Sequence, residues 1–188
     1  MTQVLERRQD ANEPHRFNVL EFERLFEAGV FGEETQVELL DGEIFVMPEM
    51  GDDHADSLTR LTKELIRKLG DFVELAPQIP LDLPEGETRP LPDFIVIDIH
   101  KYERRKPVPS DVFFLIEISD TTLSKDRKRK AAIYARNGIL EYWIVNLKDN
   151  QLEVYRKPEN GVYPKPSILQ IGQTIAPLAF PDTEIRWW

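Results

Sequence analysis

The chain has 188 residues, of which 41% are hydrophobic, and this is enough for one domain with a sizeable core. It has no cysteine and three scattered histidines, which excludes disulfides, thiolate chemistry and cysteine zinc sites and leaves oxygen ligands for any metal. No run of about 18 apolar residues could span a membrane, and Met1 to Pro14 is too polar for a secretory signal. We therefore expect a soluble, cytoplasmic protein without a membrane partner.

The net charge of −10 and pI near 4.9 argue against a protein that coats nucleic acid non-specifically, because Lys and Arg supply most non-specific affinity for phosphate.

The first part of the chain is predicted to form a tail, a short helix and a hairpin. Residues 1–15 are expected to be disordered. Asn18, followed three residues later by Glu21, is typical of a helix start, and Gly29 is expected to end that helix. Asp41-Gly42 separates two short apolar runs and is the strongest short hairpin signal.

A longer helix is predicted from about Asp53 to Leu69, and strands dominate after it. The later elements expected are strands over 72–76 and 79–83, a Pro/Gly-rich loop over 84–90, strands over 92–98 and 112–119, a helix over 125–137, a hairpin of 141–147 with 152–156, and an extended tail from Gly161. This order indicates an α+β or mixed α/β fold, with helices packed on a sheet in a single domain over 16–188.

Two acids lie in the strands predicted over 92–98 and 112–119. Burying an ionised carboxylate costs several kcal/mol unless a cation or hydrogen bonds compensate, so Glu117, which lies within an apolar run, needs a partner. Asp93 on a neighbouring strand could share one divalent ion with it, and magnesium prefers such oxygen ligands. An alternative stays open, in which Asp93 merely caps a loop and Glu117 pairs with a basic neighbour.

The charge is unevenly spread along the chain. Residues 101–130 hold nine basic residues and five acids, a local charge of +4, so the rest of the chain carries −14. A basic segment beside metal-binding acids would suit a phosphate-binding cleft, although a solvated run of surface charges explains the same pattern.

The helix predicted over 125–137 carries three polar residues on one face, because Asp126, Lys130 and Tyr134 are spaced by four. Lys130 could lean back over the strand that carries Glu117. The alternative is a surface pair of Asp126 with Lys130, worth roughly 0.3 to 0.5 kcal/mol, with Tyr134 in the core.

An ordered set of short motifs runs through the chain. These motifs are Glu38-Leu39-Leu40-Asp41-Gly42-Glu43-Ile44, His54, Pro92-Asp93, Glu117-Ile118-Ser119, Asp126, Lys130, Tyr134-Ala135, Gly138 and Glu141-Tyr142-Trp143. Together they resemble the Uma-two family of proposed restriction endonucleases, in the PD-(D/E)XK nuclease superfamily, over roughly residues 16–180. The resemblance implies a restriction-endonuclease-like fold, with a mixed central sheet flanked by helices and acids on two core strands that hold Mg²⁺ (or Mn²⁺).

The chain departs from the usual superfamily pattern at one position. A lysine normally follows two residues after the second acid, where this sequence has Ser119. The resemblance implies that Lys130, from the next helix, replaces it, and that Glu38 is an additional metal ligand. His54 and Asp126 are possible further site residues, although a histidine near a helix start is more often a packing residue. Glu43, Tyr142 and Trp143 are interpreted as structural.

The function that these residues predict is metal-dependent hydrolysis of phosphodiester bonds in nucleic acid, with DNA as the expected substrate. Asp93 and Glu117 would position the metal, and Lys130 would orient the attacking water or stabilise the developing charge. Two alternatives are a catalytically inactive binding or scaffold module with the same fold, and an enzyme that acts on a small phosphorylated molecule.

A homodimer is a further expectation. Nucleases of this fold commonly cut duplexes with two copies, and the end of the chain, Ile185-Arg186-Trp187-Trp188, offers apolar surface for a partner. The alternative is that these tryptophans dock onto their own domain.

Overall fold

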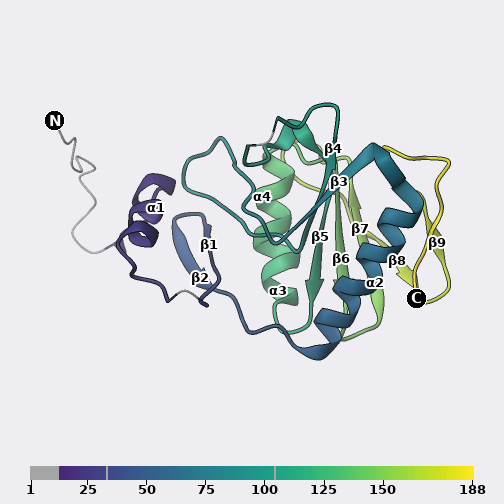
Figure 1. The fold of residues 1–188 in the computed structure, drawn as a ribbon, viewed down its shortest axis with the longest axis horizontal. Helices are drawn as coiled ribbons and strands as arrows, with labels where there is room; N and C mark the ends of the chain where they lie inside the picture. The colour runs from purple at the N-terminus through teal and green to yellow at the C-terminus, as the bar shows by residue number, and fades with distance from the viewer. Residues whose placement is uncertain (1–12, 33, 104) are drawn as a thin grey trace.

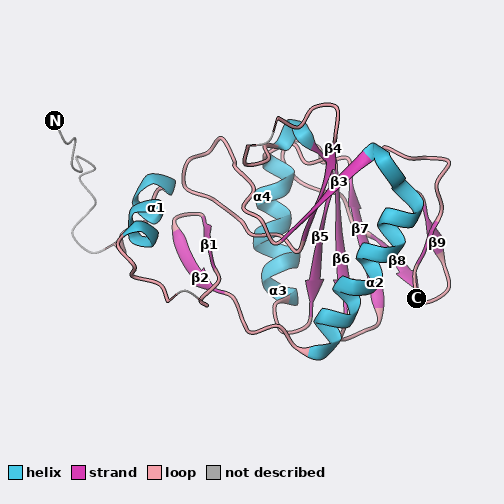
Figure 2. Cartoon of the chain, in the orientation of Figure 1, coloured by secondary structure: helices cyan, strands magenta, loops and turns pink. Residues whose placement is uncertain are grey.

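The computed structural model describes residues 13–32, 34–103 and 105–188. The disordered tail expected over residues 1–15 therefore falls mostly outside the described residues. Figures 1 and 2 show a central sheet with a helix on each face, and a small helix and hairpin that lie to one side. No helix in the described ranges is long and apolar enough to cross a membrane.

The central sheet has six strands in the order β3-β4-β5-β6-β7-β8. Their bounds are Val73–Pro77, Phe94–Asp98, Val112–Ser119, Glu141–Asn146, Gln151–Arg156 and Ser167–Gln170. Strands β5 and β6 are parallel, whereas the other neighbouring pairs are antiparallel. A parallel pair needs a crossover connection, and the helix between β5 and β6 provides it. The mixed sheet flanked by helices confirms the predicted fold class.

Each face of the sheet is covered by one helical segment. On one face lies α2, and on the other lies a segment formed by α3, a π-helical turn and α4, called here the crossover helix (Figure 1). The bounds are Asp52–Leu69 for α2, Leu123–Lys125 for α3, Asp126–Lys130 for the π turn and Ala131–Arg136 for α4. Strand β4 has an apolar sequence because both of its faces are buried. Phe94 and Val96 pack toward α2, whereas Ile95 and Ile97 pack toward the crossover helix.

The N-terminal elements form as the sequence predicts. Asn18 accepts a hydrogen bond from the Glu21 backbone N–H at 2.9 Å, and the Glu21 carboxylate accepts one from the Asn18 N–H at 2.9 Å, so α1 (Val19–Glu27) begins with a capping box. Strands β1 (Val37–Leu40) and β2 (Glu43–Val46) pair antiparallel around Asp41-Gly42. Both turn residues have positive φ, 51° and 76°, as a tight hairpin turn requires.

One sequence-based prediction about strands was wrong, and another was incomplete. Residues 79–83 form no strand, because Pro80 lacks the N–H that a ladder needs, although Leu81 and Leu83 are buried. The tail from Gly161 is not merely extended, since it supplies β8 at the sheet edge and a small pair formed by β9 (Thr174–Ile175) and β10 (Ile185–Arg186). Short 3₁₀ turns occupy Gly70–Phe72 and Pro109–Asp111.

The C-terminal tryptophans pack on their own domain. Trp187 is 5% exposed and belongs to the core cluster beneath α2, and Trp188 packs against the same cluster. The Trp187 indole N–H lies 3.4 Å from the carbonyl of Asn150, at the β6–β7 turn. The surface that suggested a homodimer is thus used within the chain, and the homodimer stays a prediction without that support.

Replacing Trp187 with Ala should lower the free energy of unfolding by about 3–5 kcal/mol, the cost of deleting a buried aromatic side chain. Trp188→Ala, in which the removed ring is only partly buried, should cost clearly less. Urea unfolding measures both, and light scattering on a sizing column gives the mass. A dimer that dissociates in Trp187→Ala without loss of monomer stability would contradict this interpretation.

Candidate functional site

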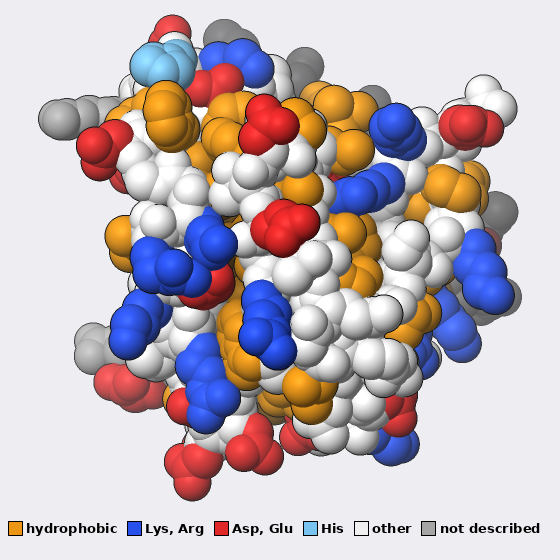
Figure 3. Space-filling view, turned by 90° about the vertical axis from the view of Figure 1, so that its right-hand side faces the viewer, with side chains coloured by type: hydrophobic (Ala, Val, Ile, Leu, Met, Phe, Trp, Pro, Cys, Tyr) orange, Lys and Arg blue, Asp and Glu red, His pale blue; other side chains and the backbone are white. Residues whose placement is uncertain are grey.

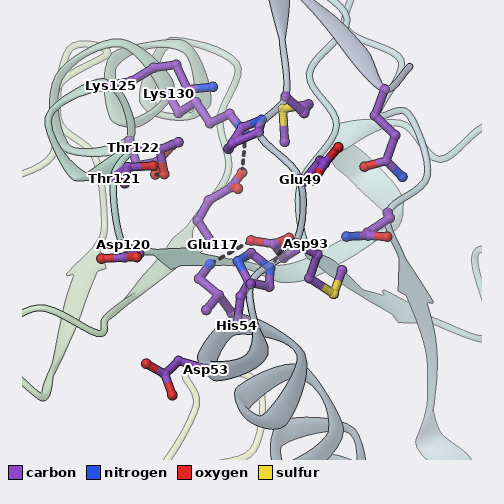
Figure 4. A pocket seen from close by; sticks show the side chains of 18 of the residues that line it. Glu49, Asp53, His54, Asp93, Glu117, Asp120, Thr121, Thr122, Lys125 and Lys130 are labelled. Atoms are coloured by element: carbon purple, nitrogen blue, oxygen red, sulfur yellow. Dashed lines mark hydrogen bonds and ion pairs between the residues drawn. The ribbon is translucent and has the colours of Figure 1, made fainter. Parts of the chain in front are cut away.

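A cavity of about 420 Å³ opens at one edge of the central sheet. Its walls come from the start of α2, the loop between β2 and α2, the ends of β4 and β5, and the crossover helix (Figure 4). The antiparallel pairing of β4 and β5 explains why the two acids meet there. Phe94 is opposite Ile116, so Asp93, just before β4, lies beside Glu117, near the end of β5.

Asp93 is held by two hydrogen bonds. Its Oδ2 accepts a bond of 2.7 Å from the backbone N–H of Ile118, and its Oδ1 lies 3.0 Å from Nε2 of His54 in the first turn of α2. Asp93 is 3% exposed, and its carboxylate contacts β5 and α2 rather than the loop before it, unlike the loop cap of the alternative interpretation. The structure brings His54, a possible site residue, directly to Asp93. Burial alone would lower the pKa of His54, but the hydrogen bond and charge of Asp93 outweigh it and raise that pKa.

Glu117 is fully enclosed and shares one oxygen between two donors. Its Oε1 accepts hydrogen bonds from Nζ of Lys130 at 2.9 Å and from the hydroxyl of Tyr134 at 2.7 Å. Burial raises the pKa of Glu117 well above its usual range, Lys130 opposes this rise, and the charges of Asp126, Asp93 and Glu38 add to it. Burial and the neighbouring acids therefore outweigh Lys130 in their effect on the pKa of Glu117.

Lys130 is 1% exposed and bridges two carboxylates, because its Nζ also lies 3.0 Å from Oε2 of Glu38. Burial would lower the pKa of Lys130, but Glu117 and Glu38 outweigh burial and raise it, so the ammonium stays charged. The predicted reach of Lys130 over Glu117 is thus present in the structure. The alternative, a surface pair with Asp126, is wrong: both side chains are buried, and Asp126 instead accepts a hydrogen bond from Ser119 Oγ at 2.7 Å.

A π turn over Asp126–Lys130 interrupts the crossover helix at this place. Such turns insert one extra residue and often occur at functional sites. Asp126 is fixed at the start of the turn by Ser119 and by Thr122, whose Oγ1 lies 2.6 Å from Asp126 Oδ2. Ser119, in the place of the usual lysine, therefore anchors the turn that delivers Lys130.

Glu38 lies behind the lysines rather than in the cavity wall. It is fully buried, its Oε1 lies 2.6 Å from Nζ of Lys125, and its Oε2 faces Lys130 and the backbone N–H of Leu91. Burial would raise the pKa of Glu38, but Lys130 and Lys125 outweigh it and lower that pKa. The expectation that Glu38 also binds a metal stays a prediction, and these contacts do not support it.

Two residues of the site were not identified from the sequence. Lys125 lines the cavity, but from the sequence it was only the start of a helix and one member of the basic segment. A spacing of five from Lys130 shares a face in a π turn but not in a regular α-helix. Tyr134 was assigned to core packing, yet its hydroxyl also bonds Glu117. The sequence did contain a signal for Tyr134, because its spacing places it on the same helix face as Asp126 and Lys130.

The described residues of the basic segment predicted over 101–130 do not form a continuous basic surface. The partners that its members contact are Asp98 for Lys101, Asp111 for Arg105, Glu23 for Lys106, Glu153 for Arg127 and Glu43 for Arg129. Figure 3 shows basic and acidic side chains interspersed on one face of the molecule. These five basic side chains are therefore paired with acids, four of which lie outside the segment.

Asp93 and Glu117 fit a divalent ion of the kind that keeps several waters. No described residue hydrogen-bonds Oε2 of Glu117, and that side chain lines the cavity. Burial and the charges of nearby acids raise the pKa of Glu117, and a bound cation would act in the opposite direction. Within the described ranges, no three His, Cys, Asp or Glu side chains are grouped as metal ligands, so further ligands would be water or substrate oxygens.

Replacing Lys130 with Met should lower the free energy of unfolding by about 3–5 kcal/mol, because Glu117 and Glu38 lose the buried cation that they share. Adding Glu38→Gln to this variant should recover part of the loss, since one uncompensated carboxylate disappears. Urea unfolding of the wild type, both single variants and the double variant measures the coupling. A loss below about 1 kcal/mol in Lys130→Met, typical of a surface pair, would contradict a buried network.

Comparisons with known proteins agree with this fold. A family model, Uma2, described as "Putative restriction endonuclease", matches residues 19–187. The chain is also similar to a crystal structure of a "putative nuclease belonging to DUF820" from Anabaena variabilis, with a TM-score of 0.70, 14% identity, and coverage of 90% of this chain and 94% of that chain. At that identity the likeness shows the fold alone. No curated protein matches the chain. Because the family match covers nearly its whole length, the chain belongs to the Uma2 family of restriction-endonuclease-like proteins.

Proposed function

We propose that this chain is a divalent-metal-dependent endonuclease that hydrolyses phosphodiester bonds in DNA. The observation that carries the proposal is the meeting of Asp93, Glu117 and Lys130 at one cavity, from two strands and a helix. The family description supports a nuclease, and the word restriction in it supports DNA. Mg²⁺ is the proposed ion, with Mn²⁺ as a substitute.

Asp93 and Glu117 would hold the ion through their carboxylates. When bound, a divalent ion lowers the pKa of a coordinated water and neutralises charge on phosphoryl oxygens. Hydrolysis forms a bond between the water oxygen and phosphorus, breaks the bond to the leaving oxygen, and transfers a proton to that oxygen.

The residues of the chain supply positioning and charge for this reaction. Lys130 stays protonated between its two carboxylates, so it acts as a hydrogen-bond donor and a fixed positive charge rather than as a base. Tyr134 and Lys130 both donate to Glu117 Oε1, whereas Oε2 has no hydrogen-bond partner among the described residues, and the Glu117 side chain lines the cavity. His54 and the Ile118 N–H hold the Asp93 carboxylate in place. Figure 4 shows Asp93 and Glu117 side by side, with His54 next to Asp93 and Lys130 on the opposite side.

An inactive binding module with the same fold is the second candidate. The observation that favours it is the charge of the cavity, which seven carboxylates and only two lysines line. Such a cavity repels phosphates unless cations are bound. Metal binding does not distinguish the two candidate functions, because both allow it, whereas a DNA cleavage assay does.

Magnesium or manganese at millimolar concentration should raise the melting temperature of the wild type, since an ion that binds only the native state stabilises it. At a concentration of about 100 times its Kd the gain is about 2.7 kcal/mol. Asp93→Asn should lose most of this shift, because it removes a charged ligand. Thermal melts with and without the ion decide the matter, with Asp82→Asn, an acid outside the cavity, as the control. An equal shift in wild type and Asp93→Asn would contradict the site.

Cleavage of DNA in the presence of magnesium should fall by at least about a hundredfold in Lys130→Ala, the loss typical for removal of one stabilising donor. Because this variant also loses stability, its rate is measured at a temperature where circular dichroism shows it folded. Lys130→Arg keeps the charge but places a larger, forked group between Glu117 and Glu38, so most activity should also be lost.

Lys128→Ala is the matched control for this experiment. Lys128 is exposed on the same π turn and forms no ion pair with a described residue. Its removal should at most weaken substrate binding in a salt-dependent way. Near wild-type cleavage by folded Lys130→Ala would show that the lysine only supports the structure.

A further inference from the structure

Gln78 combines an unfavourable backbone conformation with a place in the cavity wall. Its φ is +51°, in the left-handed region that side chains other than glycine rarely adopt. It lines the cavity together with Asp93 and Glu117. Residues held in this region cluster at functional sites, where the surrounding structure maintains the strain.

The position of Gln78 differs from that of the other described residues with positive φ. Outside glycine these are Asp41, Asn150, Lys157 and Asn160, which lie in or beside the turns that follow β1, β6 and β7, and none of them lines the cavity. Gln78 instead follows the last residue of β3, and its backbone N–H donates to the carbonyl of Asp93 at 3.2 Å. The strained residue is therefore attached to the segment that carries a proposed metal ligand.

The amide side chain of Gln78 is available to a ligand. It is half-buried, and it forms no hydrogen bond with a described residue. A glutamine amide offers a donor and an acceptor side by side, which match the edge of a nucleobase, and adenine presents the best complement in its N6 and N7 atoms.

The charge of the cavity favours recognition of a base over recognition of further phosphates. Besides the site acids, Glu49, Asp52, Asp53 and Asp120 line the cavity, and Figure 4 shows Glu49 and Asp120 on opposite sides of it. Carboxylates repel phosphates that carry no bound cation, whereas an uncharged base is not repelled. A neutral amide is the kind of group that can contact substrate here.

We propose that Gln78 determines sequence preference, by hydrogen-bonding the edge of the base next to the phosphate that is cut, with adenine preferred. The inference rests on the proposed function, because it assigns a substrate contact to the same cavity. In its left-handed conformation Gln78 lines the same cavity as Asp93, at a position where glycine would fit with less strain.

Gln78→Gly tests the side chain while keeping the backbone conformation, which glycine adopts freely. The probe is a random-sequence DNA oligonucleotide pool, single-stranded and duplex, cut in the presence of magnesium and sequenced at the ends. The wild type should show enrichment of adenine next to the cut. Gln78→Gly should reduce that enrichment by roughly fivefold or more, in line with one lost bidentate contact. Its melting temperature should not fall, because relief of the strained conformation offsets the added freedom of the unfolded chain.

Lys157→Gly is the matched control, since Lys157 also has φ +51° but is exposed and does not line the cavity. It should likewise keep its melting temperature, and the base preference should be that of the wild type.

A wild type that cuts without preference at this position, or an unchanged preference in Gln78→Gly, would overturn the inference and leave the proposed nuclease function intact. A wild type that cuts no DNA would overturn the proposed function. In that case, equal binding of the pool by wild type and Gln78→Gly would overturn this inference too, and loss of adenine-selective binding in Gln78→Gly would support it.

Discussion

The ammonium group of Lys130 joins three parts of the chain that are distant in sequence. It lies 2.9 Å from Glu117 on the central sheet and 3.0 Å from Glu38 on the N-terminal hairpin, and it is carried by the crossover helix. Buried charges of this kind are costly unless they are paired, so each partner depends on the others for its burial. The position of the hairpin, the end of β5 and the π turn are therefore linked through one cation, and the cavity is built around that link.

The sequence predicts the strands of this site better than it predicts the contacts between them. Asp93 and Glu117 stand out because acids in apolar runs are costly, and this cost is visible without a structure. The capping box at Asn18 and the turn at Asp41-Gly42 are equally local, and the structure contains both. Glu38 gives no comparable signal, because its lysine partners are brought to it by the packing of the hairpin against the crossover helix.

Other differences have the same origin in tertiary context. Ser167–Gln170 is short and half polar, yet it becomes β8 because the edge of β7 offers it a hydrogen-bonding partner. The π turn is not predicted by a helical period of 3.6, since it depends on the fastening of Asp126 by Ser119 and Thr122. The basic segment over 101–130 did not predict a basic surface for the opposite reason: its charges are local in sequence, but most of the acids that pair with them come from elsewhere in the chain.

The distribution of charge and strain around the cavity gives one account of how a protein with net charge −10 could act on a polyanion. The acids outnumber the lysines in the cavity, so a phosphate enters favourably only with cations, and the reacting phosphate is the one that the proposed ion would neutralise. Lys130 cannot leave its carboxylates without exposing buried charge, which makes it a fixed element of the site rather than a mobile phosphate binder. The uncharged part of the cavity wall is then left to distinguish one substrate from another. Gln78 lies in this part of the wall, in a strained conformation beside Asp93. Binding strength would then come from the ion and selectivity from a neutral amide, and this division suits an acidic protein that cannot rely on a broad basic surface.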